Sequence, residues 1–146
     1  MGLKTDDTLQ VQAAIPELRK AKGCVVWVSS GAAKAAYTSW AAYGSSKAAM
    51  DSIAAHLAVE EPDIASIAIT PGRVDTDMQR VLREDGKAVM DTKQHSSFVT
   101  AFEGGELFRP EQPGNVIARL VLEPQASLSG KTFRYAIWIC DHGVYE

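Results

Sequence analysis

One stretch of the chain, residues 25–49, constrains the fold more than any other, because it encodes a strand, a tight turn and a helix in succession. Val25–Val28 is a short apolar run rich in β-branched residues, which predicts a buried strand. Ser29–Gly31 supplies small residues for a turn at the end of that strand. A loop then leads into a helix that carries Tyr43 and Lys47. This order predicts a unit of an open α/β fold, in which ligands bind at the carboxyl edge of the sheet.

The remaining chain predicts further strands and helices of the same kind. We expect parallel strands near three segments, Cys24–Ser29, Ile64–Thr70 and Lys131–Tyr135. The helix from Tyr43 to about Glu60 should be the longest element. Residues 9–18 place apolar side chains at helical spacing, and Gly23 supplies a stop signal. Pro16 interrupts this pattern and predicts a kink or a break in that helix.

The C-terminal half alternates loops and shorter helices. We expect a short helix at Asp77–Arg83 and a polar region with scattered apolar residues after it. Arg109–Gly114 contains two prolines and a glycine, which predicts a loop, and the apolar spacing of Asn115–Leu122 predicts a helix. Tyr135–Cys140 is apolar enough to extend the last strand.

Tyr43, Lys47 and Ser30 have the side chains that carbonyl chemistry needs. Tyr43 and Lys47 are four residues apart, so a helix presents both on one face. A phenol has a pKa of about 10, and a neighbouring cation lowers it. Such a tyrosine can protonate a carbonyl oxygen as hydride reaches the carbon, or act as a base in the reverse direction. Ser30, at the end of the strand, could hold the same oxygen.

Other chemistry fits the sequence less well. A lone Tyr-x-x-x-Lys pair arises by chance roughly once in five such chains, so the pair gains meaning only from the serine and its context. Neither Ser30 nor Ser46 lies in the Gly-x-Ser-x-Gly string of a nucleophile elbow, which argues against serine hydrolysis. The three histidines, His56, His95 and His142, show no metal-ligand spacing. His95 has no evident partner.

Ser30, Tyr43 and Lys47, with Pro71-Gly72 further along the chain, resemble the short-chain dehydrogenases/reductases. The string SSGAAKAAYTSWAAYGSSKAAMD is most similar to the sepiapterin reductase-like and benzil reductase-like branch. The resemblance runs from about Val11 to about Phe133 and covers the second half of a family member.

The resemblance implies a Rossmann-like three-layer α/β sandwich with a parallel sheet, in which the family's N-terminal strands one to four are missing. Residues 1–146 would then form a single partial domain, with an atypical tail at 134–146. The family's glycine-rich turn, and the residue that selects NAD or NADP, would lie upstream. The asparagine that relays protons in the family should align near Leu3, and no asparagine occurs there.

The resemblance also implies an NAD(P)-dependent oxidoreductase that reduces a ketone, aldehyde or diketone by hydride transfer, with NADP, or NAD, as cofactor. Tyr43 would be the acid/base. Ser30 would hold the carbonyl oxygen. Lys47 would lower the pKa of the phenol and bond the nicotinamide ribose. The cofactor-binding residues would be Tyr43, Lys47, Pro71, Gly72, Val74 and Thr76.

Several of these residues have a structural interpretation as well. Pro71-Gly72 after a strand is an ordinary turn signal. Asp75 or Thr76 could cap the short helix that follows. In the family, the polar region beyond that helix covers the substrate, so Phe98 and Phe102 would line a pocket or pack the cover. Packing is the favoured role for both phenylalanines.

The alternative to an enzyme is a catalytically inactive truncated fragment, or a non-catalytic partner of a longer relative. Without the family's fourth strand, the first predicted strand has an unpaired edge that favours association. Cofactor binding would lack the helix N-terminus that holds the pyrophosphate. Complete relatives commonly form homodimers, and the small residues Ala48, Ala49 and Ala55 suit close helix packing. We therefore expect self-association.

Composition excludes several functional classes. The net charge is −3 and no basic run occurs, so nucleic acid and anionic membranes have no electrostatic support as partners. Cys24 and Cys140 are too few and too far apart for a disulfide framework or a metal site, and Cys24 should be buried as a small hydrophobe. No apolar run has the length of a membrane span. We expect a cytoplasmic protein whose partner is a small carbonyl compound.

Overall fold

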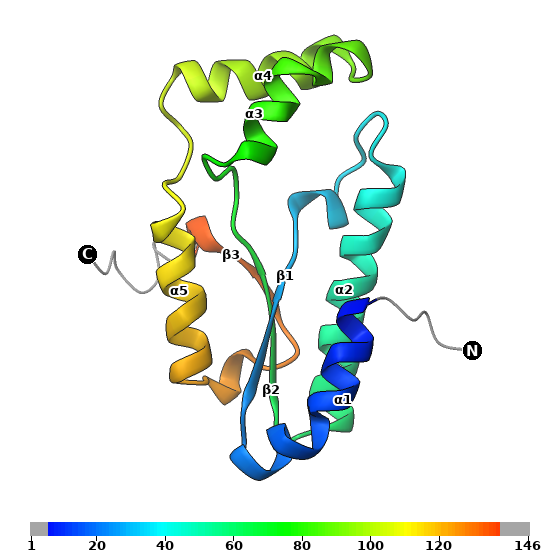
Figure 1. Ribbon diagram of the computed structural model, residues 1–146, viewed down its shortest axis with the longest axis vertical. Helices are drawn as coiled ribbons and strands as arrows, with labels where there is room; N and C mark the ends of the chain where they lie inside the picture. Colours follow the sequence, from blue (N-terminus) through cyan, green and yellow to red (C-terminus); the bar gives the residue numbers. More distant parts are fainter. Residues whose placement is uncertain (1–5, 138–146) are drawn as a thin grey trace.

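Three parallel strands lie between helices in the computed structural model, which describes residues 6–137 (Figure 1). In chain order the elements are α1 (Asp6–Ala21), β1 (Cys24–Val28), η1 (Gly31–Ala33), α2 (Ala41–Glu60), β2 (Ala65–Thr70), α3 (Asp77–Glu84), η2 (Gly86–Ala88), α4 (Thr92–Glu103), α5 (Glu111–Leu122), η3 (Ala126–Leu128) and β3 (Thr132–Arg134). The sheet order is β1-β2-β3, and both strand pairs are parallel. The three predicted strands are confirmed, and so is α2 as the longest element of the described part.

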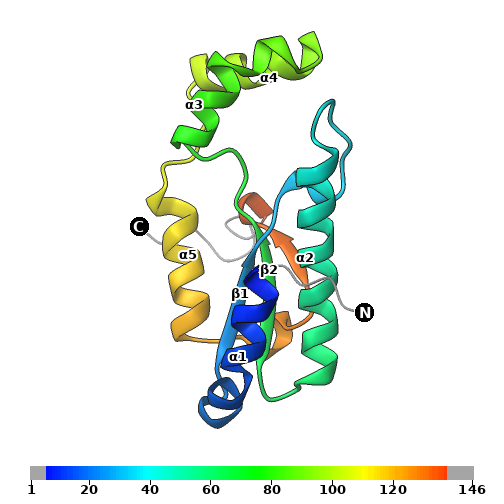
Figure 2. The same cartoon turned by 45° about the vertical axis from the view of Figure 1, so that its right-hand side comes forward.

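Helices α3 and α4 lie beyond the carboxyl ends of the strands, apart from the layers that sandwich the sheet (Figures 1 and 2). The chain leaves β2 at Thr70, reaches α3 through a loop, and returns from α4 to α5. The carboxyl edge of the sheet is therefore flanked by α2 and faces α3 and α4, which lie at the top of Figure 1.

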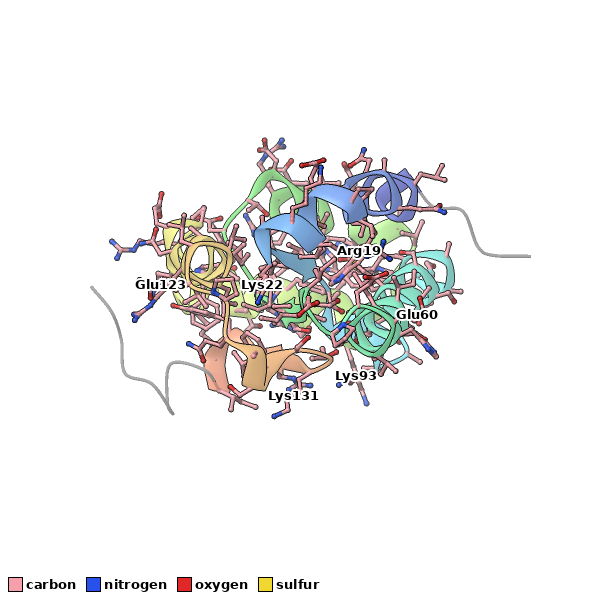
Figure 3. All side chains as sticks on the ribbon, turned by 90° about the horizontal axis from the view of Figure 1, so that it is seen from below. Arg19, Lys22, Glu60, Lys93, Glu123 and Lys131 are labelled. Atoms are coloured by element: carbon pink, nitrogen blue, oxygen red, sulfur yellow. The ribbon has the colours of Figure 1, made fainter. Side chains whose placement is uncertain are left out.

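Alternating side chains of the strands divide the core into two halves. Trp27 and Ala68 pack against Ala54 of α2, whereas Ile67 packs against Leu120 of α5. Seen from below, α1 and α2 (blue and cyan) lie on one side of the sheet and α5 (yellow) on the other (Figure 3). The two halves complete the predicted Rossmann-like three-layer α/β sandwich.

Cys24 begins β1 and packs into the half of the core under α5. Its side chain is half-buried, and desolvation raises the pKa of the thiol to about 11. This environment agrees with the predicted role of Cys24 as a small hydrophobe.

Two polar contacts cross the centre of the sheet. The indole Nε1 of Trp27 donates a buried hydrogen bond to the hydroxyl of Ser66 at 3.0 Å. The backbone N–H of Ser66 donates to the hydroxyl of Ser129 at 3.1 Å. These bonds join β1, β2 and the turn that precedes β3.

Helix α1 differs from the prediction at Pro16 and at its end. The helix is continuous from Asp6 to Ala21, so the predicted break is wrong. Gln12, whose carbonyl loses its usual helical partner to Pro16, is exposed, and water can satisfy it. At the end Lys22, and not Gly23, adopts the left-handed conformation, with a φ of 47°. Gly23 follows it and donates from its backbone N–H to the carbonyl of Leu18 at 2.9 Å.

Two further predictions in the C-terminal half are wrong. Arg109–Gly114 is not a loop throughout, because α5 begins at Glu111 and contains Pro113. A proline in the first turn loses no hydrogen bond, since the N–H groups there have no helical partner. Residues 135–137 are helical and do not extend β3. The rest of the predicted extension, the tail 138–146 and the expected asparagine position near Leu3 lie outside the described residues.

Candidate active site

The carboxyl ends of β1 and β2 open into a cleft of about 700 Å³. Clefts of this volume are typical of small-molecule sites. Every site residue predicted from the sequence lines this cleft: Ser30, Tyr43, Lys47, Pro71, Gly72, Val74 and Thr76. Because β1 and β2 are parallel neighbours, the loops that leave them meet at one edge and bring these residues together.

Ser30 follows β1 and caps the short turn η1. Its hydroxyl oxygen accepts a hydrogen bond from the backbone N–H of Ala32 at 3.2 Å. A serine that accepts this bond still has its own hydroxyl proton to donate. The cap therefore fixes the side chain at the wall of the cleft and leaves it able to bind a ligand oxygen.

Gly44 allows α2 to pack closely against η1. A Cβ at this position would lie 2.8 Å from the carbonyl oxygen of Ala32. Real Cβ atoms essentially never approach a backbone oxygen so closely. The glycine thus sets the distance between the helix that carries Tyr43 and the turn that carries Ser30.

Lys47 reaches from α2 to the end of β1. Its Nζ donates a hydrogen bond to the carbonyl of Val28 at 2.7 Å and lies 5.9 Å from the centre of the Tyr43 ring. Tyr43 is half-buried, and its ring meets Trp40 edge-on, with centroids 5.5 Å apart. The ammonium and the phenol ring therefore occupy the same wall of the cleft.

The loop from Pro71 to Thr76 forms the opposite wall and is braced by Phe108. Gly72 has a φ of 88°, and a Cβ there would lie 2.9 Å from the Phe108 ring. The backbone N–H of Asp75 donates to the carbonyl of Phe108 at 2.8 Å, and Val74 forms a parallel bridge with the same residue. Only glycine accepts this backbone geometry without strain.

Thr76 occupies the position before α3, but its hydroxyl does not cap the helix. Instead, Oγ1 donates to the carbonyl of Val74 at 3.2 Å, within the same loop. The capping role proposed for the Thr76 side chain is therefore wrong.

An aromatic wall that the sequence patterns did not predict flanks Tyr43. Trp40 contacts Tyr37 at 5.1 Å and stacks on Phe98 of α4 at 5.7 Å between ring centroids. The guanidinium carbon of Arg73 lies 4.7 Å from the centre of the Phe98 ring. The sequence carried one signal of this wall, because two aromatic residues precede Tyr43 within six positions.

Phe98 and Phe102, for which one role was predicted, lie in different environments. Phe98 is 5% exposed; it packs in the interior and also lines the cleft. Phe102 is 48% exposed, and the guanidinium carbon of Arg83 lies 3.8 Å from the centre of its ring. His95 does have a partner, contrary to expectation, because its Nε2 lies 2.9 Å from the carbonyl of Arg83. This contact joins α4 to α3.

The cleft is basic although the chain is acidic overall. Lys47, Arg73 and Arg134 line it, and no aspartate or glutamate is among its described lining residues. Ser29 and Gln79 also line it and are buried, and Ser29 Oγ and Gln79 Oε1 have no hydrogen-bond partner within the described part of the chain. The site therefore offers positive charge to a ligand.

Two classes of feature are missing from residues 6–137. No three histidine, cysteine or acidic side chains come together there as a metal site would require. No helix in this range combines the length and the apolar character that crossing a bilayer demands.

The chain is similar to several known proteins. It is 43% identical over 122 residues to an uncharacterised oxidoreductase of Schizosaccharomyces pombe, and the match covers 83% of this chain and 49% of the relative. It is 39% identical over 117 residues to a benzil reductase ((S)-benzoin forming) of Saccharomyces cerevisiae, covering 77% and 44%. The chain thus spans about half the length of the curated relatives it matches.

A crystal structure of a short chain dehydrogenases/reductase from Saccharomyces cerevisiae superimposes with a TM-score of 0.83 at 42% identity, covering 86% of this chain and 50% of that one. The family model described as short chain dehydrogenase matches residues 8–87, a range that includes β1, α2 and the loop after β2. Sequence, fold and the arrangement of the cleft agree, and the chain belongs to the short-chain dehydrogenase family.

Proposed function

We propose that this chain is the catalytic half of an NAD(P)-dependent carbonyl reductase and forms one partial domain over residues 1–146. One observation carries the proposal: Ser30, Tyr43 and Lys47 line the same cleft as the loop from Pro71 to Thr76. A proton donor, an oxygen-binding hydroxyl and a cation on one wall face a braced loop on the other. This arrangement suits proton transfer to a carbonyl oxygen that is held between them.

In the proposed reaction, Tyr43 gives its phenolic proton to the substrate oxygen as negative charge develops there. Ser30 donates a hydrogen bond to the same oxygen and stabilises that charge. Lys47 lies 5.9 Å from the centre of the Tyr43 ring and stabilises the phenolate that remains. The bond from Lys47 to the carbonyl of Val28 keeps the ammonium in place.

A nicotinamide cofactor, when bound, supplies the hydride. The basic lining of the cleft fits an anionic dinucleotide, and the loop of Gly72, Val74 and Thr76 would hold the nicotinamide end. Lys47 would bind the ribose. The chain contains no Gly-x-Gly-x-x-Gly or Gly-x-x-x-Gly-x-Gly string, so the residues present provide for the nicotinamide half of the cofactor and not for its pyrophosphate. We propose NADP as the preferred form.

We propose an aryl ketone or an aryl 1,2-diketone as substrate. Trp40 and Phe98 line the cleft, next to the proposed proton donor Tyr43. Aromatic ligands bind such walls by stacking and edge-to-face contacts. Similarity to relatives that are named benzil reductases supports the same substrate class. The low cysteine content supports a reducing, cytoplasmic location.

The proposal predicts that Tyr43→Phe removes turnover and preserves the fold, since only a hydroxyl is lost. We expect NADPH-dependent reduction of benzil to fall by at least about 100-fold, which is the contribution of a positioned general acid. NADPH oxidation measures the rate, and circular dichroism checks the fold.

Ser45→Ala is the matched control, because it removes an exposed hydroxyl from the same helix outside the cleft. It should retain the wild-type rate. Equal rates for Tyr43→Phe and wild type would refute the assigned role of Tyr43.

The second candidate is a non-catalytic partner of a longer relative, and its support is that the chain spans about half of its relatives. A titration of the chain with NADP+ separates the two. Binding supports the enzyme. Failure to bind, in a chain that remains folded, supports the non-catalytic partner.

A further inference from the structure

Arg73 connects the loop after β2 to helix α4. Its Nη1 donates to the backbone carbonyl of Ser97 at 2.7 Å, and its Nη2 donates to the hydroxyl of Ser97 at 3.0 Å. None of the ion pairs formed among residues 6–137 includes Arg73. A half-buried guanidinium without a carboxylate depends on these bonds and on the Phe98 ring for compensation. The Arg73 side chain is therefore held in place by its contacts with α4.

The backbone of Arg73 is tied to the same part of the chain. Its carbonyl accepts a hydrogen bond from the N–H of Phe108 at 2.9 Å, and Phe108 lies a few residues beyond the end of α4. Arg73 thus holds the middle of α4 by its side chain and the segment after α4 by its backbone. The loop and the helix should move as one unit.

Helix α4 and the turn before it are also tied to the segment that leads into α2, the helix that carries Tyr43. Phe98 stacks on Trp40, and the backbone N–H of Thr38 donates to Gln94 Oε1 at 2.9 Å. Ser39 donates to the carbonyl of Val89, in the turn before α4, at 2.7 Å. Side chains at the centre of α4 therefore connect the two walls of the cleft. The side-chain path runs from Tyr43 through Trp40 and Phe98 to Arg73.

We propose that Arg73 is a positioning residue that couples the loop of Pro71–Thr76 to α4, so that a ligand held by the loop and an aryl ligand against Trp40 and Phe98 bind cooperatively. The identity of the two ligands, a nicotinamide cofactor and an aryl carbonyl compound, rests on the proposed function. Arg73 lines the cleft, and the bonds of its guanidinium to Ser97 and its contact with Phe98 make it a common support of the loop and the aromatic wall.

The first test measures the coupling between the two ligands in the full chain. Quenching of tryptophan fluorescence gives the affinity for benzil with and without saturating NADP+. We expect NADP+ to tighten benzil binding by at least about fivefold in the wild type. Arg73→Met, which keeps the aliphatic stem and loses the charge and both hydrogen bonds, should show almost no tightening. Arg73→Lys, which retains the charge, should restore part of it.

Arg80→Met is the matched control, because Arg80 lies on α3, pairs with Asp77 and Glu84 at the surface and does not line the cleft. It should show the wild-type coupling. Equal loss of coupling in Arg80→Met and Arg73→Met would overturn the proposal, since the effect would then follow from charge alone.

A second measurement does not depend on either ligand. Amide hydrogen exchange of residues 92–103 should be about tenfold faster in Arg73→Met, whereas residues 111–122 of α5 should exchange as in the wild type. Ser97→Ala, which removes one of the two acceptors, gives a milder variant if Arg73→Met folds poorly. Unchanged exchange in α4 overturns the proposal whether or not ligands bind. If the wild type binds neither ligand, the proposed function and the cooperative binding fail together, and exchange alone decides the link between loop and helix.

Discussion

At the scale of single residues, the distance between α2 and η1 depends on the absence of a side chain at position 44. Gly44→Ala would place a methyl group 2.8 Å from the carbonyl oxygen of Ala32. Neither backbone can retreat without moving Ser30 or Tyr43. We predict a loss of about 1–3 kcal/mol in the free energy of unfolding, measured by urea denaturation, together with loss of benzil reduction.

Gly114→Ala provides the matched control for the stability measurement alone, because Gly114 itself lines the cleft. Gly114 lies within α5, and a Cβ there would meet nothing within 4 Å. Alanine should stabilise this helix by about 0.5–1 kcal/mol. Destabilisation by both substitutions would show that the close approach at Gly44 is not the cause.

At the scale of elements, the end of α1 carries a residue that is unsuited to its conformation. Lys22 is exposed and has a φ of 47°, which disfavours any residue with a Cβ. Lys22→Gly should raise the free energy of unfolding by about 0.5–1 kcal/mol. Lys20→Gly, two positions earlier and inside the helix, should lower it by about 1 kcal/mol. The same sign for both variants would contradict this account.

Local patterns were enough to predict the strands and the long helix. The apolar runs before Ser29 and Pro71 set β1 and β2, and the spacing from Tyr43 to Glu60 set α2. The predicted effects of two prolines were wrong. Pro16 does not break α1, because water can satisfy the carbonyl that it leaves without a partner, and Pro113 lies in the first turn of α5, where a proline is tolerated. The aromatic wall could not be predicted, because Trp40 and Phe98 meet only through tertiary packing.

At the scale of the whole molecule, β1 has one strand partner in the described range, and Val28 at its end is 43% exposed. Ala48 and Ala55 of α2 are exposed as well. An unpaired edge and a small-residue helix face both favour association between copies. We predict self-association at micromolar concentration, measured by sedimentation velocity.

Ala55→Glu should weaken this association, whereas Ala118→Glu on α5, on the other side of the sheet, should not. A monodisperse monomer at micromolar concentration would refute the prediction. Equal effects of the two substitutions would exclude α2 as the contact.

The hydrogen bond between Trp27 and Ser66 has a consequence for the accuracy of the cleft. A slip of one residue between β1 and β2 would displace Ser30 by about 3.3 Å against the facing loop and turn Trp27 toward the opposite layer. The indole N–H would then lie buried without an acceptor, at a cost of about 1–3 kcal/mol. Proton and hydride transfer tolerate errors far smaller than that displacement. A polar pair outside the cleft lining thus fixes the position of Ser30, three residues further along the chain.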